Sequence, residues 1–105
     1  MAHEITVSDL ALEISDDAWV LDVREVDEWN NGHVPTAHHI PLNSVPDMID
    51  VLPRDERIFV ICASGGRSMT AADFLVGHGF DAVSVGGGTN GWVASGREVS
   101  FAPSN

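Results

Sequence analysis

The residues best suited to chemistry form one short segment, Cys62-Ala63-Ser64-Gly65-Gly66-Arg67-Ser68, which holds the only cysteine of the chain. The apolar run 58–61 before it predicts a buried strand, and residues 69–78 after it predict a helix. Glycines let backbone N–H groups turn inward as an anion-binding concavity, and a helix N-terminus adds partial positive charge. A cysteine there should have a lowered pKa and react as a thiolate. A lone cysteine can also be a small buried core residue, but the Gly-Gly-Arg-Ser sequence in this segment favours the reactive interpretation.

Phosphate-ester hydrolysis is one chemistry that such a segment could support. Cysteine phosphatases place five residues between the cysteine and the arginine of the loop, which leaves room for a tetrahedral phosphate. Only four residues separate Cys62 from Arg67, and Ser68 stands where a phosphatase has its arginine. The shorter loop predicts a cradle for a smaller group, which disfavours a phosphatase.

Dinucleotide binding is a second chemistry that the sequence suggests. Residues 86–91 match the Gly-x-Gly-x-x-Gly pattern of dinucleotide binding, but that pattern also needs a following strand and an acidic residue about 20 positions later. The sequence contains neither, so we interpret the glycines as a turn that allows close backbone packing.

Sulfur transfer is the third chemistry that the cysteine segment could support. In this reaction, a thiolate surrounded by loop amides attacks a sulfane sulfur and holds it as a persulfide. Only one atom is transferred, so a tight loop suffices.

Composition and charge restrict the partners. Sixteen acidic residues against five arginines and no lysine give a formal net charge of −11, so nucleic acids and anionic membranes are not expected to bind. No apolar run approaches ~20 residues and the first residues lack the pattern of a signal peptide, so we expect no membrane span and a cytoplasmic location. One cysteine allows no internal disulfide and no cysteine-rich zinc site. We expect no metal site and no cofactor.

Strands and helices alternate along the chain with short connections. Strands are predicted at 4–7, 19–23, 38–40, 58–61 and 82–85, and helices at 8–15, 25–31, 45–52, 69–78 and 90–95, with a frayed tail from Ser100. This order predicts one α/β domain over residues 1–105, with a central parallel five-stranded sheet and helices on both faces. Sites in such sheets form at the carboxyl ends of the strands. Cys62, residues 22–24 and residues 86–88 are all expected at that edge.

The sequence resembles the single-domain rhodaneses, a family of thiosulfate sulfurtransferases. Matching segments run in the family's order from about Ile5 to Gly96: Leu21-Asp22-Val23-Arg24-Glu25, residues 28–37 with Ile40-Pro41, the cysteine segment, Gly79-Phe80, and Gly86-Gly87 with Trp92. The loop of one cysteine plus five further residues has the length found in the sulfurtransferase branch. The resemblance implies a rhodanese-like domain.

The resemblance also implies roles for individual residues. Cys62 would be the nucleophile that carries the persulfide. The substrate-binding residues would be those that follow it: Ala63, Ser64, Gly65, Gly66, Arg67 and Ser68. Arg67 would help to bind the sulfonate of thiosulfate, as a planar guanidinium suits an oxyanion. Asp22, Arg24 and Glu28 would form a charge-paired supporting network beneath the loop.

The expected reaction moves a sulfane sulfur from thiosulfate or another persulfide donor to cyanide or a thiol acceptor. Ala63 leaves Arg67 as the only cation of the loop, whereas many active relatives have a basic or bulky residue at that position. A doubly charged donor could therefore bind weakly, and a protein could serve as persulfide donor or acceptor. The alternatives are a persulfide carrier or redox-sensing module that acts with a protein partner and, less favoured, a cysteine phosphatase.

Overall fold

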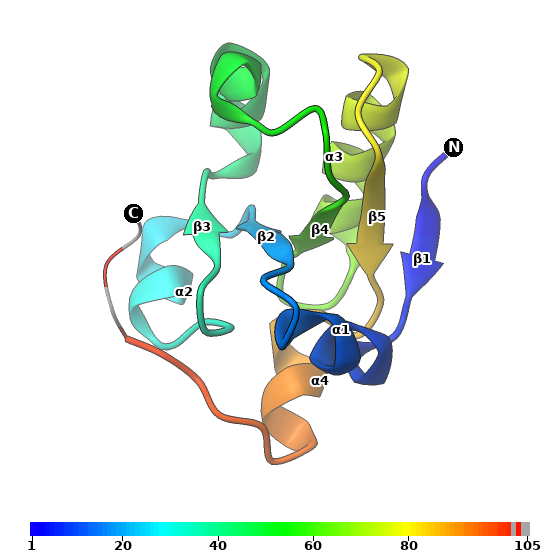
Figure 1. The fold of residues 1–105 in the computed structure, drawn as a ribbon. Coiled ribbons are helices and arrows are strands. Elements are labelled where there is room, and N and C mark those ends of the chain that lie inside the picture. The colour runs from blue at the N-terminus through cyan, green and yellow to red at the C-terminus, as the bar shows by residue number, and fades with distance from the viewer. Residues whose placement is uncertain (102, 104–105) are drawn as a thin grey trace.

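Five parallel strands form the sheet at the centre of the protein. The structure, a computed structural model, describes residues 1–101 and 103. The sheet has the order β1-β5-β4-β2-β3 (Figure 1). Its strands are β1 (His3–Ile5), β2 (Trp19–Asp22), β3 (His38–His39), β4 (Ile58–Ile61) and β5 (Ala82–Val85). Every paired strand runs parallel to its neighbour, which confirms the predicted sheet.

Helices cover both faces of this sheet, as predicted. The helices are α1 (Val7–Ile14), α2 (Val26–Asn30), the 3₁₀ helix η1 (Leu42–Val51), α3 (Gly66–Gly77) and α4 (Gly88–Ala94). Ile58 and Val60 of β4 pack with residues of η1 and α3, whereas Phe59 and Ile61 pack with residues of α1, α2 and α4. Successive side chains of a strand point to opposite faces. Two apolar clusters, one on each side of the sheet, therefore hold β4 in the middle of the molecule.

Four helices begin earlier than the sequence predicts, and one of them is α4, which begins at Gly88 instead of residue 90 because Gly87 turns the chain with a φ of +82°. Helix α1 begins at Val7 because Thr6 caps it: the Thr6 hydroxyl accepts from the Asp9 N–H and the Asp9 carboxylate accepts from the Thr6 N–H, both at 3.0 Å. Helix η1 begins at Leu42 instead of residue 45 and is a 3₁₀ helix, with Pro46 lacking an N–H inside it. Helix α3 begins at Gly66, directly after Gly65 turns the chain with a φ of +122°. The first turn of α3 therefore includes Arg67 and Ser68, two residues predicted to lie in a loop.

The carboxyl-terminal segment is held against the domain. Ser100 forms an isolated antiparallel bridge with His33, with backbone hydrogen bonds of 2.9 and 2.8 Å in the two directions. The indole N–H of Trp92 also donates to the Glu98 carbonyl at 2.7 Å. The prediction of fraying from Ser100 is therefore wrong at Ser100 itself. Within residues 1–101 and 103, no helix is long and apolar enough to cross a membrane.

Candidate active site

Cys62 lies directly after β4, at the carboxyl edge of the sheet and before the first turn of α3. The residue is buried, at 1% exposed. The Gly65 N–H donates to the Cys62 Sγ at 3.1 Å, and the Ser68 hydroxyl oxygen lies 3.4 Å from the same sulfur. Ser64 and Gly66 are exposed beside it. The loop therefore surrounds the sulfur with hydrogen-bond donors.

The start of α4 orients this loop from behind. The Thr89 N–H donates to the Cys62 carbonyl at 2.8 Å, and the Asn90 N–H donates to the Ala63 carbonyl at 3.0 Å. With these two carbonyls bonded to α4, the peptide groups that follow can direct N–H groups toward the sulfur. Gly88 permits the approach, since a Cβ there would lie 2.5 Å from both the Cys62 and Ala63 carbonyl oxygens. This contact explains why Gly88 is a glycine in a turn of close backbone packing, as the sequence predicts.

The surroundings of Cys62 favour the thiolate. Burial raises the pKa of the thiol, while hydrogen bonds from the Ser68 hydroxyl and the Ser68, Gly65 and Ser64 backbone lower it. The hydrogen bonds outweigh burial, so the pKa of Cys62 lies below its ordinary value.

Alkylation by iodoacetamide should report this lowered pKa. Only the thiolate reacts, so the rate constant should fall as the pH drops through the pKa of Cys62. Half of the maximal rate should come at a pH below the ~8.5 of an ordinary cysteine. The measurement is the alkylation rate as a function of pH, with a cysteine-containing peptide as reference. If the pH of half-maximal rate were equal to or higher than that of the peptide, the hydrogen bonds to the sulfur would not outweigh its burial.

Asp22 and Arg24 form a buried ion pair beside the end of β2. Arg24 Nε donates to both Asp22 carboxylate oxygens at 3.0 and 3.1 Å, and its Nη2 donates to Oδ2 at 2.8 Å. The same Nη2 donates to the Gly32 carbonyl at 2.9 Å, and the His39 ring donates to the Arg24 carbonyl at 2.7 Å. Through its carbonyl and its guanidinium, Arg24 thus connects the end of β2 to β3 and to the turn that follows α2. This position suits a supporting role.

Glu28 pairs with Arg67, whereas the sequence predicts it in a network with Asp22 and Arg24. Its carboxylate accepts two hydrogen bonds from the Arg67 guanidinium, at 2.7 and 2.8 Å. This bidentate contact lowers the pKa of Glu28 to about 2, against the opposing effect of burial, and raises the pKa of Arg67. The lowered pKa stabilises the fold above pH ~4.3, an effect lost as the pH falls toward 2. Instead of one network there are two pairs, Asp22–Arg24 and Glu28–Arg67, because α2 turns Glu28 toward the start of α3.

The sequence predicted Ser68 as a site residue but missed three positions that contact the cysteine segment, namely Ser84, Thr89 and Asn90. Ser68, expected to bind substrate, is fully buried beneath the sulfur and contacts Ser84 of β5, whose hydroxyl oxygen lies 2.8 Å away. Nothing in the sequence marked Ser84, which stands in an otherwise apolar strand. The support that Thr89 and Asn90 give the loop comes from backbone N–H groups, so side-chain motifs could not identify it.

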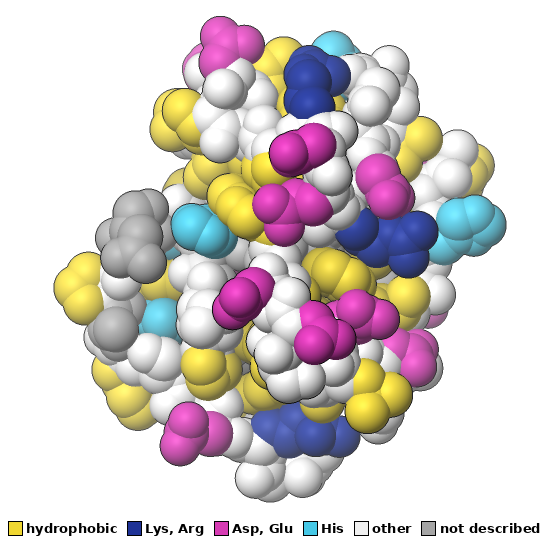
Figure 2. All heavy atoms as spheres, in the orientation of Figure 1, with side chains coloured by type: hydrophobic (Ala, Val, Ile, Leu, Met, Phe, Trp, Pro, Cys, Tyr) yellow, Lys and Arg dark blue, Asp and Glu magenta, His cyan; other side chains and the backbone are white. Residues whose placement is uncertain are grey.

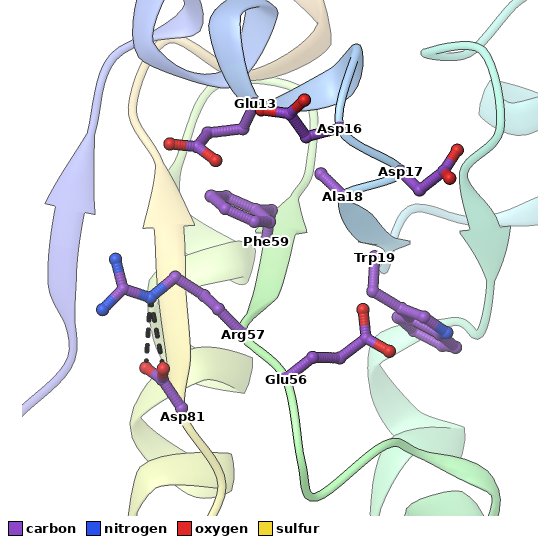
Figure 3. Close-up of a pocket in the computed structure, with 9 residues that line it drawn as sticks. All are labelled: Glu13, Asp16, Asp17, Ala18, Trp19, Glu56, Arg57, Phe59 and Asp81. Carbon is purple, nitrogen blue, oxygen red and sulfur yellow. Dashed lines mark hydrogen bonds and ion pairs between the residues drawn. The ribbon is translucent and has the colours of Figure 1, made fainter.

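A pocket of about 380 Å³ lies at the other end of the sheet, where β2, β4 and β5 begin (Figure 3). Its lining residues are Glu13, Asp16, Asp17, Ala18, Trp19, Glu56, Arg57, Phe59 and Asp81. Figure 3 shows Arg57 turned toward Asp81, its one ion-pair partner among the residues drawn. On the face shown in Figure 2, acidic side chains are spread widely and basic ones are few. This pocket is remote from Cys62, which follows the carboxyl end of β4.

Comparison with known proteins agrees with this geometry. The family described as Rhodanese-like domain matches residues 6–95. The chain belongs to this rhodanese-like family. The thiosulfate sulfurtransferase GlpE of Pseudomonas putida is 38% identical over 87 residues, which are 82% of this chain and 79% of GlpE. The crystal structure of a rhodanese-related protein from Thermoplasma volcanium is 35% identical, with a TM-score of 0.90 and coverage of 95% of this chain and 99% of that one.

A third relative bears on the kind of sulfurtransferase. YrkF of Bacillus subtilis, named as a candidate sulfur carrier protein, is 41% identical over 64 residues, which are 61% of this rhodanese-like chain but 35% of YrkF. The names of these relatives support a general sulfurtransferase role for the rhodanese-like chain. Its substrates require a separate argument.

Proposed function

We propose that this rhodanese-like protein transfers a sulfane sulfur through a persulfide on Cys62. The contact that best supports the proposal is the Gly65 N–H at 3.1 Å from the Cys62 sulfur. In a loop of this length, backbone donors can stabilise the negative charge of a thiolate or of a persulfide. The donor is thiosulfate or another persulfide, and the acceptor is cyanide or a thiol.

The transfer has two balanced steps. The Cys62 thiolate attacks the outer sulfur of thiosulfate, a new S–S bond forms, and sulfite leaves with the electron pair of the bond that breaks. Cyanide then attacks the outer sulfur of the persulfide and leaves as thiocyanate, which restores the thiolate. A thiolate acceptor attacks the same atom and leaves as a persulfide anion. Neither step needs a metal or a cofactor.

The mass of the intact protein after treatment with thiosulfate tests this proposal. The wild-type protein should gain the mass of one sulfur atom and lose it on addition of cyanide, with thiocyanate released. Cys62→Ser provides the control, because it keeps the size of the side chain but lacks the nucleophile, and it should gain no mass. Normal thiocyanate formation by Cys62→Ser would refute the role of Cys62.

The Arg67–Glu28 ion pair affects which sulfur donors can bind beside Cys62. Arg67 is the only cation of the loop, and Glu28 already holds its guanidinium through two hydrogen bonds. A thiosulfate sulfonate that binds Arg67 must compete with that carboxylate. We infer that Glu28 weakens the binding of anionic donors.

Glu28→Gln should therefore lower the KM for thiosulfate. An amide keeps part of the hydrogen bonding but removes the competing charge, and loss of one charge-assisted contact predicts a decrease of about threefold to tenfold. Steady-state kinetics with thiosulfate and cyanide measure it. Asp27→Asn is the matched control, since it removes the same charge from an exposed position of the same helix. An equal change in both variants would assign the effect to net charge instead of to Arg67.

A second candidate is a persulfide carrier or redox-sensing module that works with a protein partner. It is favoured by the same engagement of Arg67 and by Ala63, which adds no cation to the loop. This alternative predicts slow turnover of thiosulfate but rapid loading of Cys62 by a protein persulfide. A third candidate, cysteine phosphatase, predicts hydrolysis of an aryl phosphate that Cys62→Ser blocks. Absence of that hydrolysis in the wild-type protein would end it.

Three broader features belong to the same proposal. Residues 1–105 form a single rhodanese-like domain. The protein acts in the cytoplasm, where a reducing environment keeps one reactive thiol available. Nucleic acids and membranes are not its partners, because a net charge of −11 opposes binding to either anionic surface.

A further inference from the structure

A chain of buried hydroxyl groups leads away from the Cys62 sulfur into the core. Ser68 and Ser84 are both 0% exposed. The Ser84 hydroxyl oxygen lies 2.8 Å from the Ser68 hydroxyl oxygen, which in turn lies 3.4 Å from the Cys62 sulfur. Ser84 stands in β5 between Val83 and Val85, all of them buried. A polar side chain at such a position costs stability unless it is hydrogen-bonded.

The number of protons limits how these groups can bond. Each hydroxyl carries a single proton and can also accept. Besides Ser84 and the sulfur, the Ser68 hydroxyl has one hydrogen-bond partner in the described part of the chain, the Gly65 carbonyl at 3.1 Å, and a carbonyl can only accept. Within residues 1–101 and 103, Ser68 is the one hydrogen-bond partner of the Ser84 hydroxyl. The direction of the Ser84–Ser68 hydrogen bond therefore decides where the Ser68 proton can go.

Two directions are possible, and they have opposite consequences. If Ser84 donates to Ser68, the Ser68 proton is available to the Gly65 carbonyl when Cys62 is a thiol and to the sulfur when it is a thiolate. If Ser68 donates to Ser84, its proton is held away from the sulfur. In that case a thiolate would face a hydroxyl lone pair, which repels it.

We propose that Ser84 is a positioning residue that donates to Ser68 and so keeps the Ser68 hydroxyl available as a donor to the Cys62 thiolate. This inference rests on the proposed function, in which Cys62 reacts as a thiolate. Hydrogen bonds in a chain polarise one another, so the Ser84 donor also strengthens the bond from Ser68 to the sulfur. The lowered pKa of Cys62, to which the Ser68 hydroxyl contributes, agrees with this direction.

The pH dependence of Cys62 alkylation tests the inference in the full chain, with no sulfur donor present. Ser68→Ala should raise the pKa of Cys62 by about one unit, the effect of losing one hydrogen bond to a charged group. Ser84→Ala should raise it by about half a unit, because it removes the polarising donor but leaves Ser68. In the double variant the pKa should equal that of Ser68→Ala alone, since Ser84 acts through Ser68. Ser95→Ala, a change at the end of α4 remote from the sulfur, should leave it unchanged.

A second pair of variants keeps the test valid if Ser84→Ala does not fold. Ser84→Thr and Ser84→Val have nearly the same shape and both suit a strand, but only threonine keeps the hydroxyl. Threonine should retain the wild-type pKa and valine should raise it. An unchanged or lowered pKa in Ser84→Ala or Ser84→Val, or additive shifts in the double variant, would overturn the inference. Because the readout uses iodoacetamide, it stays informative even if the protein accepts no sulfur from thiosulfate.

Discussion

Replacing Gly88 with alanine is expected to lower the free energy of unfolding by about 4 kcal/mol and to reduce sulfur transfer at least tenfold. The new Cβ would lie 2.5 Å from the Cys62 and Ala63 carbonyl oxygens, inside van der Waals contact with backbone that cannot rotate away. The φ of +57° adds the cost of a left-handed residue, ~1–2 kcal/mol. Relief of the clash must break the bonds from Thr89 and Asn90 to the loop, at about 1 kcal/mol each. The loop would then lose the orientation that directs its N–H groups at the sulfur.

Urea unfolding and the thermal midpoint measure the loss of stability, which corresponds to roughly 20 °C in Tm. Gly77→Ala is the matched control, because a Cβ on that glycine in α3 would meet nothing within 4 Å apart from its chain neighbours and the backbone of its own helix. Alanine there should leave activity unchanged and stabilise the helix by about 0.5–1 kcal/mol. Wild-type activity and stability in Gly88→Ala would show that α4 does not hold the loop.

Replacing Arg24 with leucine is expected to cost about 3–5 kcal/mol of stability. Asp22 is fully buried, and Arg24 supplies the hydrogen bonds that compensate its charge. Removal of the guanidinium leaves that carboxylate without its counterion and the Gly32 carbonyl without its donor. Chemical denaturation measures the loss. If the pair has the supporting role that its position suits, transfer activity should fall only through the unfolded fraction.

Two further variants show whether the loss of stability in Arg24→Leu comes from the unpaired buried charge of Asp22. Arg57→Leu breaks an ion pair with Asp81 whose side chains are 53% and 57% exposed, and it should cost less than about 1 kcal/mol. The double variant Asp22→Leu/Arg24→Leu removes both charges and should be more stable than Arg24→Leu alone. A double variant less stable than the single one would mean that Asp22 holds other groups that matter more than its charge.

The sheet and its two helical layers could be predicted because apolar runs and their spacing follow directly from which faces are buried. Cys62 could be placed at the carboxyl edge because the strand before it ends in a glycine-containing turn. The sequence predicts the start of α3 at Met69, because glycine has a low helix propensity. The helix begins at Gly66 instead, because the positive φ of Gly65 turns the chain into the helix at that point. Propensity is a weak guide where a positive φ sets the boundary.

Other features depend on contacts between distant segments, which a sequence pattern does not contain. Arg67 pairs with Glu28 because the start of α3 lies beside α2, and spacing along the chain does not specify that approach. Ser84 becomes relevant to Cys62 only because β5 lies next to β4 and places its hydroxyl under Ser68. In the sequence, Ser84 is a small polar residue in a strand.

The support that α4 gives to the loop has a consequence for how the protein is made. Thr89 and Asn90, whose N–H groups support the loop, follow Cys62 by 27 and 28 positions in the sequence and are synthesised after it. Until β5 and α4 are in place, the Cys62 and Ala63 carbonyls lack these donors, and α4 does not orient the loop around the cysteine. The environment that lowers the pKa of Cys62 is thus complete only once α4 has docked on the loop, so the thiol gains its reactivity together with the fold that buries it.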